Sequence, residues 1–349
     1  MDEESEGDIA RLRRRATWAS VGVASTLILV KLGAYVSTGS VALLSSLIDS
    51  TVDLFASLVI FVGVRFALQP PDVTHRFGHG KSEPLAAMAQ ALFIIGSAVF
   101  LVYEGVNRLV NPEPVRHGWI GMSAIGVALV LTVALIVYQG HVMRRTGSVA
   151  IGADQLHYTA DVGMNLAVLL ALVLVQQTGW PYFDPIFALG IAGYLIYGAW
   201  AIAGTSLGML MDRELPPEDR RRSREIVMAH PETRGVHDMR TRNAGDRIFI
   251  ELHLELDSHL TLEAAHDITD AVENEVAEAF TNAEILIHQE PEGLDDERLD
   301  QRLRRETEKK AQARATVMAS RRAGVAYLAG LVAASLLTIA AVAYYLAGD

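Results

Sequence analysis

The sequence predicts an α-helical membrane protein, in which a six-helix transmembrane bundle is followed by a soluble α+β domain and one extra C-terminal transmembrane helix. Hydrophobic residues make up 51% of the 349 residues, charged residues make up only 20%, and the mean hydropathy is +0.25. This composition is too apolar for an ordinary soluble domain of the same length. Several stretches of about 20 residues are almost free of charge, which is long enough to cross a hydrocarbon core about 30 Å thick.

Six of these apolar runs precede a more polar segment, and basic residues mark one side of them. The runs lie near 18–36, 41–68, 85–109, 119–142, 149–176 and 183–211. Four arginines between positions 11 and 15 precede the first run, and more Lys and Arg flank the second and fourth loops. The positive-inside rule therefore predicts a cytoplasmic N-terminus and a cytoplasmic segment after the sixth run. A cleaved signal peptide is the alternative for the first run, but the run is too long and no A-x-A-like site follows it.

The segment from Asp212 to Asp300 is strongly acidic and has the texture of a soluble domain. It holds 24 acidic and 10 basic residues, a balance of −14, whereas the rest of the chain carries about +3. Nucleic acid is therefore a poor partner for this segment, and small cations are a natural one. Apolar and polar residues alternate along 248–257, which predicts a half-buried strand. With strands near 236–242 and 284–289 and a helix at 262–280, the predicted order is helix, strand, strand, helix, strand.

These boundaries predict five segments. They are a cytoplasmic N-terminal segment at 1–15, a six-span membrane domain at 16–211, a cytoplasmic domain at 212–293, a charged linker at 294–320 and a seventh membrane helix at 321–349. Two arginines begin the last segment and two tyrosines near its end suit the opposite interface. We therefore expect the C-terminus outside the cytoplasm.

Two apolar runs carry ionisable residues at a depth where charge is costly. Asp49 and Asp53 lie in the second run, and His157 and Asp161 lie in the fifth. Each pair is spaced i, i+4, so on a helix both side chains share one face. If the two faces meet, three carboxylates and one imidazole form a site suited to tetrahedral Zn²⁺. Hydrogen bonding between helices is the alternative interpretation, and Lys31 in the first run is assigned no role.

The absence of cysteine restricts the chemistry further. With Cys 0, the chain offers no disulfide, no thiolate ligand and no nucleophilic cysteine, so any metal must be held by His nitrogen and carboxylate oxygen. The sequence therefore argues against soft Cu(I) as a cargo, because that ion prefers thiolate ligands. A membrane-embedded zinc protease would need an H-E-x-x-H helix, and the sequence contains none.

With these motifs the chain resembles the cation diffusion facilitator family, and within it the bacterial zinc and iron exporter branch. The resemblance covers roughly 16–291 and includes a loop with Asp72, His75, His79 and Lys81, and a late Ile-His-Gln-Glu-Pro sequence ending at Pro291. It implies a homodimer of six-span protomers, each with a cytoplasmic metallochaperone-like, ferredoxin-like domain, in the bacterial inner membrane. It also implies export of divalent metal against proton influx.

The resemblance also implies further site residues. Asp72, His75 and His79 match a second metal site found in part of the family, with a solvated loop and incidental histidines as the alternative. Lys81 and Asp212 match a charge interlock between protomers. Glu290 stands where close relatives usually have Asp, which leaves the geometry of its centre open. The soluble-domain positions that match metal ligands in relatives are His237, His253, His266, His288 and Glu290.

The sequence therefore predicts a secondary transporter that moves Zn²⁺ out of the cytoplasm in exchange for protons. Zn²⁺ is also the expected regulatory ligand of the acidic domain. The ligand types leave Fe²⁺, Cd²⁺, Mn²⁺, Co²⁺ and Ni²⁺ open as cargo, because affinity order and cellular supply do not follow from ligand identity. A metal-sensing membrane scaffold without transport and a passive channel remain as alternatives.

Overall fold

A computed structural model of the chain describes residues 3–38, 41–111, 119–180, 182–245, 247–280, 282–294, 298–316 and 318. The predicted seventh membrane helix at 321–349 lies outside these residues. The main elements are α1 (Glu3–Thr38), α2 (Val41–Ala67), α3 (Ser82–Val110), α4 (Trp119–Thr146), α5 (Val149–Thr178), α6 (Phe183–Leu210), α7 (Pro217–Ala229), β1 (Gly235–Asn243), β2 (Ile248–Leu256), α8 (Leu262–Ala279) and β3 (Ala283–Pro291).

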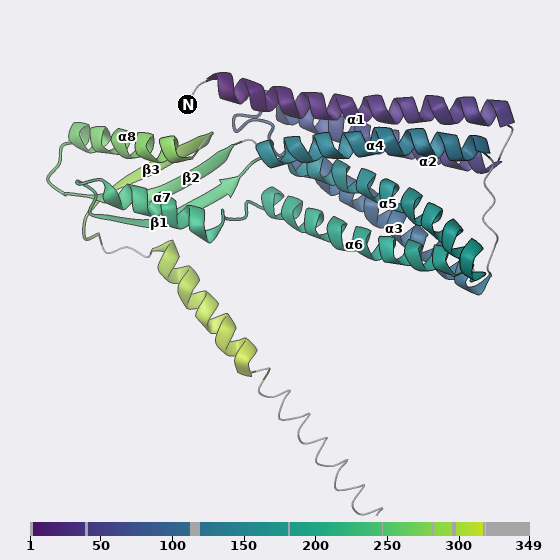
Figure 1. Ribbon diagram of the computed structural model, residues 1–349. Helices are drawn as coiled ribbons and strands as arrows, with labels where there is room; N and C mark the ends of the chain where they lie inside the picture. The colour runs from purple at the N-terminus through teal and green to yellow at the C-terminus, as the bar shows by residue number, and fades with distance from the viewer. Residues whose placement is uncertain are drawn as a thin grey trace, which may run out of the picture. The chain divides into compact units, whose positions relative to one another are not determined.

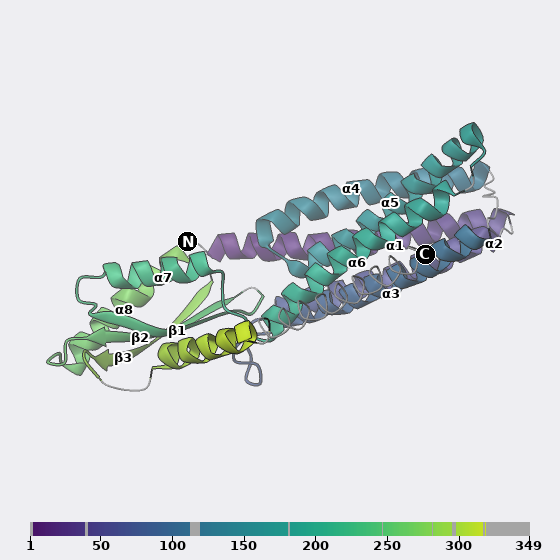
Figure 2. The ribbon, with the colours of Figure 1, turned by 90° about the horizontal axis from the view of Figure 1, so that it is seen from below.

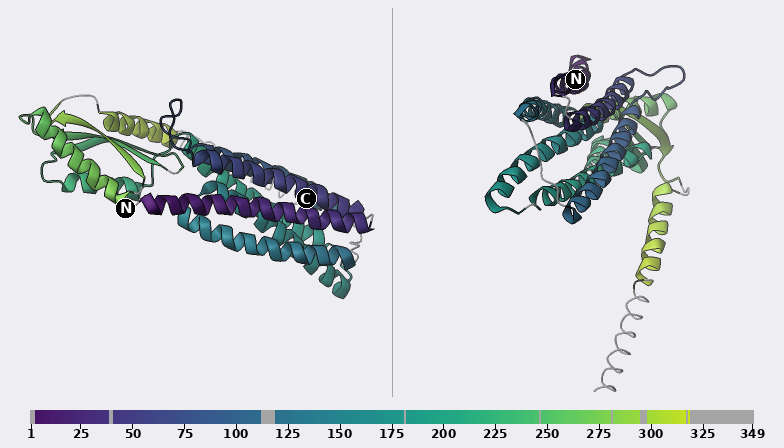
Figure 3. Two further views of the ribbon diagram at one scale, coloured as in Figure 1. Left: turned by 90° about the horizontal axis from the view of Figure 1, so that it is seen from above. Right: turned by 90° about the vertical axis from the view of Figure 1, so that its right-hand side faces the viewer.

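The helices α1 to α6 lie side by side as an elongated bundle (Figure 1). Within the described residues, six helices are long and apolar enough to cross a membrane, which confirms the predicted spans. Helix α1 begins well before the first apolar run, because the residues ahead of that run are mostly Glu, Arg and Ala, which favour helix. Helix α3 packs along α6, and α1 packs along α2 and α4 (Figure 3).

Small residues allow the helices of the bundle to approach closely. A Cβ atom added to Gly63 of α2 would lie 2.3 Å from the Cβ of Ala86 on α3, so only glycine fits there. Ala87 and Ala153 are fully buried in the same cluster, which joins α2, α3 and α5. Because close backbone approach gains van der Waals contact in a membrane, this packing holds α5 against α2.

A buried ion pair connects three parts of the bundle. Arg13 of α1 lies 3.1 Å from Glu83 at the start of α3, and their side chains are 5% and 2% exposed. Arg13 also donates a hydrogen bond of 2.8 Å to the backbone oxygen of Thr146 at the end of α4. A buried charge is tolerated only when it is paired and hydrogen-bonded, so these contacts fix α1 against the start of α3 and the end of α4.

The soluble domain contains a three-stranded sheet in the order β1-β2-β3 (Figure 2). The N–H of Arg234 bonds to the oxygen of Glu255, as in an antiparallel β1-β2 hairpin. The N–H of Ile248 bonds to Asn282 and that of Glu292 bonds to Leu256, so β3 runs parallel to β2. A parallel pair needs a crossover, which α8 supplies. This order of elements confirms the prediction from the sequence.

Alternate residues of β2 face the core of this domain. Ile250, Leu252 and Leu254 are almost completely buried, as are Val272 and Val276 of α8. Since side chains alternate along a strand, the histidine and glutamates of β2 must project from the opposite face of the sheet. The predicted alternation is therefore confirmed, and it leaves one polar face.

A charged helix over 299–316 follows the domain, and its side chains are exposed from 301 to 316. Asp238 accepts hydrogen bonds of 2.8 Å from the backbone N–H groups of Leu299 and Asp300. Burial alone would raise the pKa of Asp238, but the two N–H groups outweigh it and hold the pKa below its usual value. Arg298 lies 2.7 Å from Glu255, so the start of this helix is fixed to the domain by two carboxylates.

Candidate metal centres

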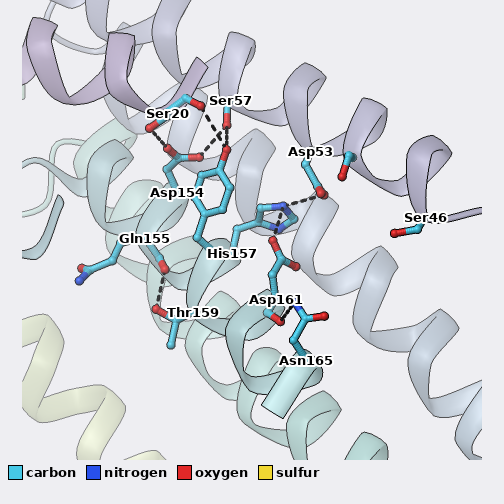
Figure 4. A network of polar contacts seen from close by, with 12 residues as sticks. Ser20, Ser46, Asp53, Ser57, Asp154, Gln155, His157, Thr159, Asp161 and Asn165 are labelled. Carbon is cyan, nitrogen blue, oxygen red and sulfur yellow. Dashed lines mark hydrogen bonds and ion pairs between the residues drawn. The ribbon is translucent and has the colours of Figure 1, made fainter. Parts of the chain in front are cut away.

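Helices α2 and α5 bring a carboxylate–imidazole group together inside the bundle. His157 Nε2 lies 3.0 Å from Asp53 Oδ1 and 3.8 Å from Asp161 Oδ2 (Figure 4). One ligand atom from each of the three residues lies within 4.8 Å of the others, which is close enough to share an ion. Imidazole nitrogen and carboxylate oxygen are ligands that Zn²⁺ accepts.

The fourth predicted residue, Asp49, lies one helical turn before Asp53. It lines the same cavity of about 580 Å³ as Asp53, His157 and Asp161, but its carboxylate is not within the tight three-residue group. Lys31 of α1 lines this cavity as well. The structure thus places all four predicted residues at one cavity and brings three of them to mutual ligand distance.

One buried carboxylate near this group was missed by the sequence analysis. Asp154 is 1% exposed and lies one turn before His157 on α5. It accepts hydrogen bonds from Ser20 at 2.6 Å and Ser57 at 3.2 Å (Figure 4). It accepts a third from Gln139 at 2.7 Å. These partners belong to α1, α4 and α2, so one side chain connects four helices. Asp154 precedes His157 by three residues, and this i, i+3 spacing is not one of the i, i+4 pairs by which the sequence indicates the site.

A second group lies in the loop between α2 and α3. Asp72, His75 and His79 offer ligand atoms within 4.8 Å of one another. The Thr74 hydroxyl, followed by the backbone N–H groups of His75 and Thr74, holds the pKa of Asp72 well below its usual range. These bonds all use Asp72 Oδ1, whereas Oδ2 lies 3.4 Å from His79 Nε2. The loop therefore presents an ionised carboxylate with one oxygen facing an imidazole.

A third group lies on the polar face of the sheet, with one residue from each strand. Glu290 of β3 lies 2.6 Å from His253 Nδ1 and 3.1 Å from His237 Nε2, using a different oxygen for each. The three residues form a ligand group, of which His237 and Glu290 are buried and His253 is partly buried. Glu255 borders it, 3.5 Å from His237 Nε2. A glutamate side chain is one methylene longer than an aspartate side chain, and the Glu290 carboxylate contacts both histidines.

The other two predicted histidines are placed differently. His288 Nε2 lies 3.5 Å from Glu290, and its ring centre lies 4.8 Å from that of His253. His266 is on an exposed position of α8 and is not part of the three-residue group. The sheet therefore supplies His288 to the edge of the centre, whereas the single chain does not bring His266 there.

The predicted charge pair forms within one chain. Lys81 Nζ lies 2.9 Å from Asp212 Oδ1, and Arg242 lies 3.6 Å from the same oxygen. The Lys81 and Asp212 side chains are 39% and 44% exposed. A role for this pair between protomers stays a prediction.

Both halves of the chain match domains of known proteins. Residues 17–211 match the cation efflux transmembrane domain, and residues 215–292 match the cytoplasmic domain of cation efflux proteins. The chain is 47% identical over 276 residues to the cation-efflux pump FieF of Shewanella oneidensis, which covers 79% of this chain and 93% of that protein. It is 46% identical over 284 residues to the cation-efflux pump FieF of Klebsiella pneumoniae, covering 81% and 94%.

Solved structures similar to this chain include the zinc form of CzrB. It shares 38% sequence identity, covers 25% of this chain and 99% of that chain, and has a TM-score of 0.24. The metal-bound C-terminal domain of the CzcD transporter from Thermotoga maritima shares 25% identity, covers 23% and 93%, and has a TM-score of 0.22.

The bundle with its carboxylate–imidazole group, joined to a small domain with a second such group, defines an integral membrane protein that handles metal ions. The chain belongs to the cation efflux (cation diffusion facilitator) family, as its two domain matches and its relatives show. It is therefore a divalent cation efflux transporter and not an enzyme.

Proposed function

We propose that the protein exports Zn²⁺ from the cytoplasm in exchange for protons, by exposing one site to each side of the membrane in turn. The observation that carries this proposal is the group of Asp53, His157 and Asp161 at a cavity inside the bundle. A mixed nitrogen and oxygen ligand set suits Zn²⁺, whereas Mn²⁺ favours more oxygen and softer ions favour sulfur. Fe²⁺, Cd²⁺ and Co²⁺ use the same ligand types and are the alternative cargoes.

Proton exchange follows from the chemistry of these ligands. A carboxylate or imidazole must lose its proton before it binds metal, so protons and metal compete for the same lone pairs. A proton arriving from the outer side therefore helps to expel the ion, and export uses the proton gradient. A passive channel would need no such competition.

The topology of the proposed exporter follows from the loop charges. We place it in the bacterial inner membrane, with the N-terminus and the soluble domain in the cytoplasm and the C-terminus outside if the segment at 321–349 crosses the lipid bilayer. In this topology the chain consists of a cytoplasmic N-terminal segment, a six-span transport domain, a cytoplasmic metal-binding and dimerisation domain, a charged linker and a seventh transmembrane helix, at 1–15, 16–211, 212–293, 294–320 and 321–349.

Uptake by proteoliposomes tests the proposal. Purified protein would be reconstituted with a metal-sensitive dye inside, and Zn²⁺, Cd²⁺, Fe²⁺, Co²⁺ and Mn²⁺ would be added in turn with and without a pH gradient. We expect Zn²⁺ uptake that rises when the interior is acidic and that moves protons in the opposite direction. Uptake that is indifferent to the gradient would indicate a channel, and no uptake of any metal would favour a metal-sensing scaffold.

We further propose that the protein is a homodimer whose soluble domains respond to cytoplasmic metal. Two copies of a segment that carries −14 repel each other, and divalent ions held by His237, His253, His288 and Glu290 offset that repulsion. His266, at an exposed position of α8, would add a ligand to such a centre from the partner copy. Lys81 and Asp212 would then connect the protomers near the membrane.

A spectroscopic distance measurement tests this second proposal. The chain has no cysteine, so a single Glu278→Cys change on the exposed side of α8 gives one labelling site per protomer. In the full-length reconstituted dimer we expect the label-to-label distance to shorten when Zn²⁺ is added. An unchanged distance, or an equal change after His237, His253 and Glu290 are all replaced by Ala, would contradict the sensor role.

A further inference from the structure

Lys31 is a lysine inside the membrane bundle whose function the ligand geometry leaves open. Its Nζ donates a hydrogen bond of 2.6 Å to the Ser50 hydroxyl and one of 3.2 Å to the backbone oxygen of Ser46. Both partners lie on α2, one helical turn apart, and Ser50 is the neighbour of Asp49. An ammonium group within a membrane helix is energetically costly, and charged residues at such depth usually line ion or substrate pathways.

The hydrogen bonds of Lys31 fix its position without cancelling its charge. Both acceptors are neutral oxygens, so the ammonium keeps a full positive charge at the wall of the cavity. That cavity is the one lined by Asp49, Asp53, His157 and Asp161. Lysine carries a compact charge on a flexible side chain. The hydrogen bonds to α2 hold this charge close to Asp49 and Asp53, which lie on the same helix.

The formal charges at this cavity balance one divalent ion. The charged side chains among its lining residues are Lys31, Asp49, Asp53 and Asp161, which together carry −2 when the carboxylates are ionised and His157 is neutral. One bound divalent cation therefore neutralises the side chains that line the cavity, a set that does not include the buried Asp154. Without Lys31, the loaded cavity would retain one negative charge inside the bilayer, where uncompensated charge is expensive.

We infer that Lys31 is the residue that sets the charge of the transport cavity, matching it to divalent cations and keeping metal affinity low enough for release. This inference rests on the proposed transport site and deepens it. The fixed positive charge opposes the incoming cation through a medium of low dielectric, so it weakens binding. It also leaves the loaded site neutral, which favours a full turnover for a 2+ ion over a 3+ ion.

Two variants of Lys31 separate its charge from its hydrogen bonding, and a third lysine variant is the control. Lys31→Gln keeps a donor for Ser46 and Ser50 but removes the charge, and Lys31→Arg keeps the charge. Lys309→Gln, on the exposed charged helix, controls for loss of a lysine elsewhere. Each full-length protein would be checked for monodisperse behaviour, titrated with Cd²⁺ and with Tb³⁺ in detergent, and assayed for Zn²⁺ uptake in proteoliposomes. Binding that disappears in Asp161→Ala is assigned to the cavity.

We expect Lys31→Gln to bind Cd²⁺ about tenfold or more tightly, to gain still more affinity for Tb³⁺, and to transport Zn²⁺ with a lower kcat and a lower KM. Lys31→Arg, which keeps the charge, should bind both ions more weakly than Lys31→Gln does, and Lys309→Gln should match the unmodified protein. Unchanged Cd²⁺ affinity in Lys31→Gln, an equal gain for Cd²⁺ and Tb³⁺, or a Lys31→Arg protein that behaves like Lys31→Gln would overturn the inference.

The binding and uptake arms distinguish this inference from the proposed function. If the affinity shifts occur but no protein takes up metal, the charge-setting role of Lys31 stands and transport is wrong. If metal is taken up while Lys31→Gln binds Cd²⁺ with unchanged affinity, transport stands and the role of Lys31 is wrong.

Discussion

The bundle and the sheet each assemble histidine and carboxylate groups, but they do so in different ways. In the bundle, Asp53 and the pair His157 and Asp161 come from two helices that face a cavity of about 580 Å³. In the soluble domain, His237, His253 and Glu290 come from three strands of one hydrogen-bonded sheet.

This difference indicates different tasks for the two centres. Helices that meet across a cavity can separate without breaking backbone hydrogen bonds, since every such bond lies within one helix. Strands of a sheet share their backbone hydrogen bonds, so ligands on neighbouring strands stay at a fixed spacing. The bundle centre is thus suited to accepting and releasing an ion, and the sheet centre is suited to holding one.

The largest effect should come from removing a bundle ligand. We expect Asp53→Ala or Asp161→Ala to reduce Zn²⁺ uptake by proteoliposomes at least about 100-fold, since losing even a supporting residue of a metal site often costs 10–100-fold. The Asp8→Ala change at an exposed position of α1 is the matched control and should leave uptake unchanged. Near-normal uptake by either Asp53→Ala or Asp161→Ala would contradict the assignment of transport to the bundle centre.

A large loss of stability should follow from breaking the Asp154 network. Asp154→Ala leaves the groups of Ser20, Ser57 and Gln139 without their shared acceptor in a buried place, which should cost about 2–3 kcal/mol. We expect the membrane bundle to unfold at a lower temperature in detergent and the soluble domain to unfold at an unchanged temperature. If Asp154→Ala unfolds at the same temperature as Asp8→Ala, the network does not stabilise the bundle.

A change of ligand type in the bundle should alter metal preference. His157→Asp replaces nitrogen by oxygen and makes the site harder, so we expect uptake of Mn²⁺ or Fe²⁺ to rise about tenfold relative to Zn²⁺. Competition uptake with mixed metals measures this ratio directly. The corresponding His253→Asp change in the sheet should leave the ratio unchanged, and an equal shift in both variants would argue against a single selectivity site.

The smallest effect should come from the exposed pair of Lys81 and Asp212. Reversing one charge should cost about 0–1 kcal/mol, because the pair is partly exposed and screened by salt. We expect chemical crosslinking of the dimer to weaken in Lys81→Asp and in Asp212→Lys, and to recover when both changes are combined. If the combined variant crosslinks no better than the single ones, the pair does not hold the protomers together.

The two centres also differ in how far the sequence predicts them. The candidate site of the bundle follows from local spacing, because two i, i+4 pairs of ionisable residues in apolar runs leave little choice of face. The sheet ligands are separated by tens of residues, and alternation predicts which face of β2 holds His253 but not that Glu290 lies between it and His237. That meeting depends on strand order and register, so only the resemblance to a family could suggest it.

The remaining differences arise from tertiary contacts of single residues. The docking of Asp238 on the helix at 299–316 and the joining of four helices by Asp154 involve partners far apart in the sequence. No local pattern encodes such contacts. The exposed position of His266 likewise depends on how α8 packs against the sheet. The apolar periodicity of α8 predicts which of its side chains are buried, but not what the exposed ones contact.

One variant tests the division of tasks between the two centres most directly: the full-length protein in which His237, His253 and Glu290 are all replaced by Ala. Its Zn²⁺ uptake would be measured as a function of Zn²⁺ concentration. We expect slower uptake at low Zn²⁺, where the sheet centre would be needed for activation, and a maximal rate close to that of the unmodified protein at saturating Zn²⁺. A maximal rate reduced to background, in a variant that is folded and still dimeric, would contradict the claim that the bundle transports the ion and the sheet centre only senses it.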